Sequence, residues 1–135
     1  MVEFLITYAV VTALYLGIDA LWLGLVATSF YKKALGNLML EKPKIGIAAL
    51  FYLIYAAALA VLVVLPALDS GSAEKALGFG ALFGFAAYGT YDVTNLATLK
   101  NWPVKMSLVD WAWGSTLSGF VALSAYLVLS QLFGF

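Results

Sequence analysis

The sequence predicts an all-α integral membrane protein, a single domain that forms a bundle of four transmembrane helices with a short interfacial helix between the first two. Hydrophobic residues make up 64% of the 135-residue chain and charged residues only 10%. Soluble domains are roughly 45–50% apolar and about 25% charged. The mean hydropathy of +1.01 therefore indicates a chain whose solvent is itself apolar.

Four apolar stretches are long enough to cross the hydrocarbon core of a bilayer, which takes about 20 residues. The predicted spans are Phe4–Ala27, Ile45–Leu68, Ala76–Leu99 and Trp111–Phe135. The first stretch exceeds the apolar region of a signal peptide, and no Lys or Arg precedes it, so we expect a retained helix. The second and fourth spans contain no charged residue, whereas the first contains Asp19 and the third contains Asp92.

The linker after the first span carries its own helical signal. Within Thr28–Leu40, apolar residues recur at helical spacing up to the break at Pro43. This pattern predicts a short helix lying in the membrane interface. The alternative is that the segment simply extends the first helix.

The lysines predict the orientation of the bundle in the membrane. Six of the seven lie in the first and third linkers, namely Lys32, Lys33, Lys42, Lys44, Lys100 and Lys105. Cytoplasmic loops carry an excess of Lys and Arg, so these two linkers are expected to face the cytoplasm. Both termini are then expected on the opposite side.

Small residues predict where the helices pack closely. Gly80 and Gly84 in the third span, and Gly114 and Ser118 in the fourth, are each four residues apart. This spacing lets membrane helices approach each other closely. Gly17 and Gly24, both in the first span, predict a similar contact there.

Three acids stand where acids are costly. An Asp at the centre of a membrane helix costs about 2.5–3.5 kcal/mol on insertion scales, so it normally faces the bundle interior and marks a candidate site. From their places in the sequence, Asp19, Asp92 and Asp110 lie roughly 18, 12 and 8 Å from the helix ends expected to be cytoplasmic. All three acids are therefore expected in the same half of the membrane.

Hydrogen-bond donors follow each acid by one helical turn. Trp22, Asn95 and Trp113 stand three residues after Asp19, Asp92 and Asp110, where each side chain is able to reach the acid. Two tyrosines beside Asp92 add hydroxyl groups. We predict one polar cavity for ligand binding or proton coupling, formed by Asp19, Trp22, Tyr88, Tyr91, Asp92, Asn95, Asp110 and Trp113.

Structural roles are the alternatives for these residues. Asp110 also fits a helix N-terminal acid, with Ser107 as a cap. Asp92 also fits a buried acid tied to Asn95 or to a tyrosine, and Asp19 a hydrogen-bonded core residue. For most of the tryptophans, an aromatic belt at the membrane interface is the default interpretation.

The residue types that are missing exclude several kinds of chemistry. The chain has no Cys, His or Arg, which excludes thiolate chemistry, imidazole-held metals and guanidinium clamps on phosphate. No cofactor and no metal site is assigned from the sequence. The formal net charge is zero and there is no basic run, so nucleic acid is not an expected partner.

Several motifs resemble those of a known family. They are Asp19-Ala-Leu-Trp22-Leu-Gly24, Phe30-Tyr31, Leu35-Gly36, Tyr91-Asp92-Val-Thr94-Asn95, Trp102-Pro103, and Asp110 with Trp113-Gly114. Together they cover nearly the whole chain, which is similar to the bacterial membrane proteins grouped as domain-of-unknown-function family 2177. The resemblance implies a small four-helix protein of the bacterial inner membrane, surrounded by membrane lipids. It implies no established activity, but it favours a connection with lipids.

Three hypotheses of function follow. The first is a protein that binds or transports a small or amphipathic, lipid-like molecule in the cavity of aspartates, with a homodimer needed for transport. The second is an enzyme that modifies a lipid or isoprenoid, with two or three carboxyl groups that either hold Mg²⁺ or divide the acid and base roles. The third is a non-catalytic partner subunit of a lipid-modifying enzyme.

Overall fold

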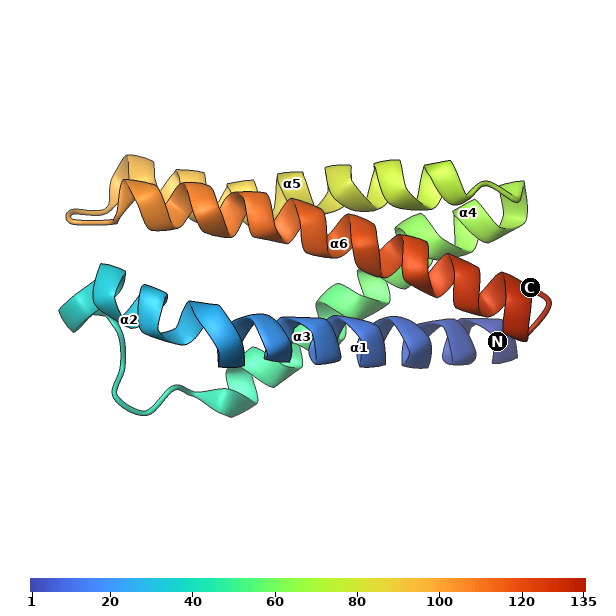
Figure 1. The fold of residues 1–135 in the computed structure, drawn as a ribbon, viewed down its shortest axis with the longest axis horizontal. Helices are drawn as coiled ribbons and strands as arrows, with labels where there is room; N and C mark the ends of the chain where they lie inside the picture. The colour runs from blue at the N-terminus through green and yellow to red at the C-terminus, as the bar shows by residue number, and fades with distance from the viewer.

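Helices alone build the structure, a computed structural model that describes residues 1–135 (Figure 1). The elements are α1 (Val2–Trp22), the π-helical turn η1 (Leu23–Ala27), α2 (Thr28–Leu35), the 3-10 turn η2 (Gly36–Leu38), α3 (Ile45–Leu59), the π-helical turn η3 (Ala60–Val64), α4 (Leu65–Ser70), α5 (Ala73–Thr98) and α6 (Val104–Leu132). The π turns connect helices without ending them, so the chain runs as four helical rods.

The first rod is longer than predicted. It runs from Val2 to Leu38 over 37 residues and passes through η1 without a break. The backbone N–H of Thr28 donates to the carbonyl oxygen of Leu23, and the Thr28 hydroxyl donates to the same atom at 2.6 Å. These two bonds hold the wider turn in place. The predicted separate interfacial helix is therefore wrong, and the alternative, an extension of the first helix, is the arrangement found.

The second rod contains its own π turn, η3, shortly before a proline. Pro66 has no backbone N–H to bond the carbonyl of Leu62, which disfavours a regular α-helical turn here. The rod ends at Gly71, which adopts the left-handed conformation with φ 65°. The N–H of Ser72 donates to Ala67 at 3.1 Å and that of Gly71 to Leu68 at 3.2 Å, a Schellman motif.

The third rod starts directly after this cap. The Ser72 hydroxyl accepts a hydrogen bond from the N–H of Lys75 at 3.1 Å, as an N-cap residue does. α5 then runs to Thr98, and α6 returns antiparallel to it after a turn of five residues, 99–103 (Figure 1). These two helices form the most extensive contact in the molecule.

Small residues allow this contact. A Cβ atom at Gly80 would lie 2.7 Å from that of Ala122, and one at Gly84 would lie 2.7 Å from that of Ser118. The predicted close packing of the third and fourth spans is confirmed. At Gly17 and Gly24, no neighbouring atom lies within 4 Å of the position that a Cβ atom would take, so the contact predicted in the first span is wrong.

Three rods are long and apolar enough to cross a membrane: Val2–Leu38, Ile45–Ser70 and Val104–Leu132. Helix α5 has 26 residues but is less apolar, so its crossing stays a prediction. The bounds of the second and third predicted spans lie close to those of the rods, but the fourth rod begins at Val104 and not at Trp111.

Large apolar side chains are exposed on the outer faces, among them Leu25, Phe51, Phe79, Leu82 and Phe120. Such faces suit a surrounding of lipid.

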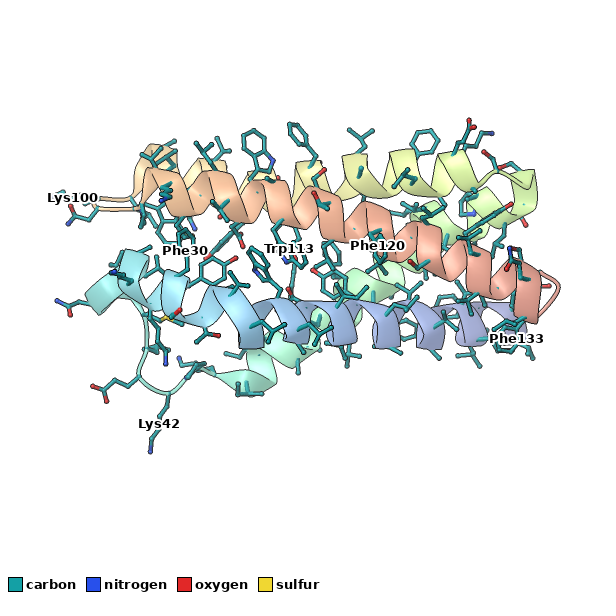
Figure 2. The ribbon with its side chains drawn as sticks, viewed as in Figure 1. Phe30, Lys42, Lys100, Trp113, Phe120 and Phe133 are labelled. Atoms are coloured by element: carbon teal, nitrogen blue, oxygen red, sulfur yellow. The ribbon has the colours of Figure 1, made fainter.

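The two ends of the bundle differ in charge. Both termini and the turn between α4 and α5 lie at one end, and the linkers that carry six of the seven lysines lie at the other (Figure 1). Figure 2 places Lys42 and Lys100 at that end, opposite Phe133. We name it the lysine-rich end. Its orientation toward the cytoplasm stays a prediction.

The oblique course of the second rod creates room for a site. α3 crosses the bundle diagonally (Figure 1), with its main backbone contacts to α1. Only from η3 onward does this rod pack closely on α5 and α6. The first half of α3 therefore diverges from α5 toward the lysine-rich end, and large side chains bridge the gap.

Candidate ligand-binding site

A cavity of about 460 Å³ lies between α3 and α5. Its walls are Tyr15 from α1, Ala48, Phe51, Tyr52 and Tyr55 from α3, Ala87, Tyr88 and Tyr91 from α5, and Asp110 from α6. Six of these nine residues are aromatic, and Asp110 is the only charged one. Ligand cavities in proteins are commonly about 300–1,000 Å³ and mostly apolar, with a few polar groups that orient the ligand.

Tyrosine hydroxyl groups fix the deep wall of this cavity. The hydroxyl groups of Tyr15 and Tyr88 are hydrogen-bonded to each other, and the Tyr55 hydroxyl is 2.6 Å from that of Ser118. The ring of Tyr55 packs against both other tyrosines, with centroids 5.1 Å from Tyr15 and 6.0 Å from Tyr88. A Cβ atom at Gly114 would overlap the Tyr88 ring, so only glycine fits there. All four rods thus contribute to one wall.

Asp19 joins three rods beside the cavity. Its side chain is almost completely buried and accepts two hydrogen bonds, from the Tyr52 hydroxyl at 2.8 Å and from the Trp113 indole at 3.1 Å. Figure 2 shows Trp113 reaching from α6 into the space toward α1. Asp19 does not line the cavity itself, but it orients Tyr52, which does.

Neither tryptophan that follows an acid donates to that acid. Trp22 does not donate to Asp19; its indole donates to the Tyr31 hydroxyl at 3.2 Å, and its ring stacks on Trp113 with centroids 4.3 Å apart. Trp113 donates to Asp19 and not to Asp110. The predicted pairing of each tryptophan with the acid one turn before it is therefore wrong.

Asp110 receives its donor from the far end of the first rod. The Tyr31 hydroxyl donates to its carboxyl group at 2.7 Å. Ser107 does not cap α6, because Pro103 is the N-cap residue and the Ser107 hydroxyl donates to the Pro103 carbonyl at 2.6 Å. The capping alternative is thus wrong for Ser107, and Asp110 stands in the second turn of α6, at the cavity wall.

Asp92 is fully buried and unpartnered. Neither carboxyl oxygen has a hydrogen-bond donor, so the predicted bond from Asn95 is absent. Asp110 is the charged residue that interacts with its carboxyl group. Two adjacent carboxylates repel each other, so a proton or another cation is needed between them. We refer to Asp92 and Asp110 as the carboxyl pair.

A second orphan polar atom stands in the same region. The indole nitrogen of Trp102 is buried without an acceptor, while its ring meets the Tyr91 ring edge-on at 5.7 Å between centroids. Trp102 therefore packs against a residue of the cavity wall. Buried polar atoms are nearly always hydrogen-bonded in native proteins, so orphans beside a cavity mark a place where a ligand or water completes the bonding.

The structure brings most of the predicted site residues into one connected region. Asp19, Trp22, Asp110 and Trp113 are linked through Tyr31 and Tyr52, and Tyr88 and Tyr91 line the cavity. Asp92 joins through Asp110, whereas no side-chain hydrogen bond connects Asn95. The sequence prediction missed six wall residues, namely Tyr15, Ala48, Phe51, Tyr52, Tyr55 and Ala87. Tyrosines deep within a span, away from the interfaces where they usually gather, were the available signal.

The fold and this site define a small multi-span membrane protein with an aromatic cavity beside buried carboxyl groups. The chain belongs to the family described as "Predicted membrane protein (DUF2177)", whose family model matches residues 4–127. This result confirms the resemblance seen in the motifs. No curated protein and no solved structure matches the chain.

Proposed function

We propose that the protein binds an amphipathic, lipid-like molecule in the cavity between α3 and α5. The observation that carries this proposal is the composition of the wall, with six aromatic rings and one carboxyl group around about 460 Å³. The rings would hold the apolar part of the molecule, and the Asp110 end would hold its polar head. Transport, chemical modification and presentation to a partner enzyme would each begin with this binding step.

Entry from the surrounding lipid is supported by the exposure of the wall. Phe51 is 62% exposed and Tyr91 is 52% exposed, whereas Tyr15 on the opposite wall is 1% exposed. The cavity therefore opens sideways between α3 and α5 and closes at the bundle core. An amphipathic molecule would enter through this side without crossing the bilayer.

Asp19 has a positioning role in this proposal. It accepts hydrogen bonds from one cavity residue, Tyr52, and from Trp113 on the helix behind it. Both of its oxygens are thereby occupied. We therefore place the polar head of the ligand at the carboxyl pair and not at Asp19.

Filling the cavity is expected to abolish binding. Ala87 lines the cavity, so Ala87→Phe would place a ring inside it. Its neighbour Ala86 is exposed and does not line the cavity, which makes Ala86→Phe the matched control. The probe is dodecan-1-ol with a photoactivatable diazirine, applied to purified protein in nanodiscs of zwitterionic lipid, and labelled peptides are mapped by mass spectrometry.

In the wild type and in Ala86→Phe, labelling is expected to concentrate on cavity residues of α3 and α5. Ala87→Phe should lose most of it. Labels spread evenly over the lipid-facing surfaces, or unchanged by Ala87→Phe, would contradict the proposed binding site. Circular dichroism of the three proteins checks that the helices are intact.

A further inference from the structure

The carboxyl pair lacks a positive partner within the protein. The chain contains no Arg or His, and all seven lysines are exposed. No nitrogen or hydroxyl donor reaches either oxygen of Asp92, although the residue is fully buried. A buried carboxylate without a partner is strongly unfavourable, so the pair requires a proton or a cation from outside the protein.

Aromatic faces stand next to Asp110, the member of the pair that lines the cavity. Asp110 shares the cavity wall with six aromatic residues, five of them tyrosines. Tyrosine rings attract cations through their negative faces, and the attraction increases when water is excluded. A cavity that combines such rings with carboxyl groups is the arrangement that recognises ammonium groups.

We infer that the molecule bound in this cavity carries a cationic nitrogen, a protonated amine or a quaternary ammonium, held between the carboxyl pair and the tyrosine rings. This inference rests on the proposed function and adds the charge of the ligand's polar head. The opposite charge is disfavoured, because an anionic head at the same place would meet the carboxyl group of Asp110, with Asp92 buried behind it, and no basic side chain. The charge of the site thus determines the kind of polar head, and the aromatic wall determines that the rest of the molecule is apolar.

A competition experiment tests the inference with three amphiphiles of equal chain length. Dodecyltrimethylammonium, dodecan-1-ol and dodecyl sulfate compete against the photoactivatable dodecanol for labelling of the cavity. Nanodiscs of zwitterionic lipid keep the membrane surface from concentrating either ion. In the wild type we expect the ammonium compound to compete at a concentration at least about tenfold lower than the alcohol, which corresponds to about 1.4 kcal/mol. The sulfate should be the weakest competitor.

Removing one charge of the pair is expected to remove this preference. Asp92→Asn keeps the shape of the side chain and breaks no hydrogen bond, because no donor reaches Asp92. Asp110→Asn keeps an oxygen that accepts from Tyr31. Either variant should bring the ammonium compound within about threefold of the alcohol, less than 0.7 kcal/mol by the same conversion. Asp69→Asn, a change of an exposed acid, is the control and should behave as the wild type.

The outcomes separate the two proposals. Labelling by the neutral probe reports an intact cavity, so a variant that keeps this labelling and loses the ammonium preference supports the inference. Equal competition by the ammonium compound and the alcohol in the wild type would overturn the inference and leave the proposed function standing. A preference that survives in both Asn variants would also overturn it. Absence of cavity labelling in the wild type would overturn the proposed function itself.

Discussion

Replacing Trp113 by alanine is expected to lower the free energy of unfolding by about 3–5 kcal/mol, the range for a packed tryptophan truncated to alanine. The side chain makes two contacts with the first rod. Its indole donates to the buried Asp19 at 3.1 Å, and its ring stacks on Trp22 with centroids 4.3 Å apart. The substitution removes both contacts and leaves Asp19 with one donor, Tyr52.

Trp113→Phe separates the two effects. It keeps an aromatic ring against Trp22 and removes only the donor, so we expect a smaller loss of about 1–2 kcal/mol. The control is Phe120→Ala on the same helix, because Phe120 is 54% exposed. Unfolding in detergent, followed by circular dichroism against increasing dodecyl sulfate, measures the differences. A loss in Trp113→Ala no greater than that in Phe120→Ala would show that this contact does not hold the bundle together.

Replacing Gly84 by leucine is expected to separate α5 from α6. Even the first added carbon would lie 2.6 Å from the Ser118 hydroxyl oxygen and would press on the backbone carbonyl of Gly114. Overpacking costs roughly 1–3 kcal/mol when side chains are able to shift, and more when they are not. Because backbone atoms oppose the new side chain here, we expect a loss of about 3 kcal/mol, with a smaller loss for Gly84→Ala.

The matched control is Gly17, which lies in a helix like Gly84 but has open space around it. Gly17→Ala should leave the stability unchanged or raise it by up to about 1 kcal/mol, because alanine favours helix over glycine. The same unfolding assay measures both positions. If Gly84→Leu unfolds at the same dodecyl sulfate concentration as the wild type, the close approach of α5 and α6 is not required for stability.

The number and approximate bounds of the rods could be predicted because the bilayer demands long apolar stretches. The same criterion failed where a helix continues beyond the apolar stretch. α6 begins seven residues before Trp111, since Lys105 and Asp110 reduce the hydropathy without interrupting the helix. The continuity of Val2–Leu38 was one of two alternatives that the sequence left open, because the hydrogen bonds of the π turn depend on geometry that the order of residues does not reveal.

The acids of the site were predictable because a charge inside a membrane helix is costly and therefore informative. Their partners were not, because helical spacing predicts only contacts within one helix. Trp113 reaches Asp19 across the bundle, and Tyr52 reaches it from an oblique helix that carries no charged residue. The cavity depends on the crossing direction of α3, which arises from packing among all four rods. No local pattern encodes that direction.

The π turn η1 also sets the rotational phase of the first rod. Residues of a regular α-helix advance by about 100° each, so Asp19 and Tyr31, twelve positions apart, would point about 120° away from each other. A π turn takes up one residue more than an α turn, which reduces the difference to about 20°. Asp19 and Tyr31 therefore both face α6, where they meet Trp113 and Asp110. The single extra residue in Leu23–Ala27 thus allows one continuous helix to contact two separate turns of its neighbour.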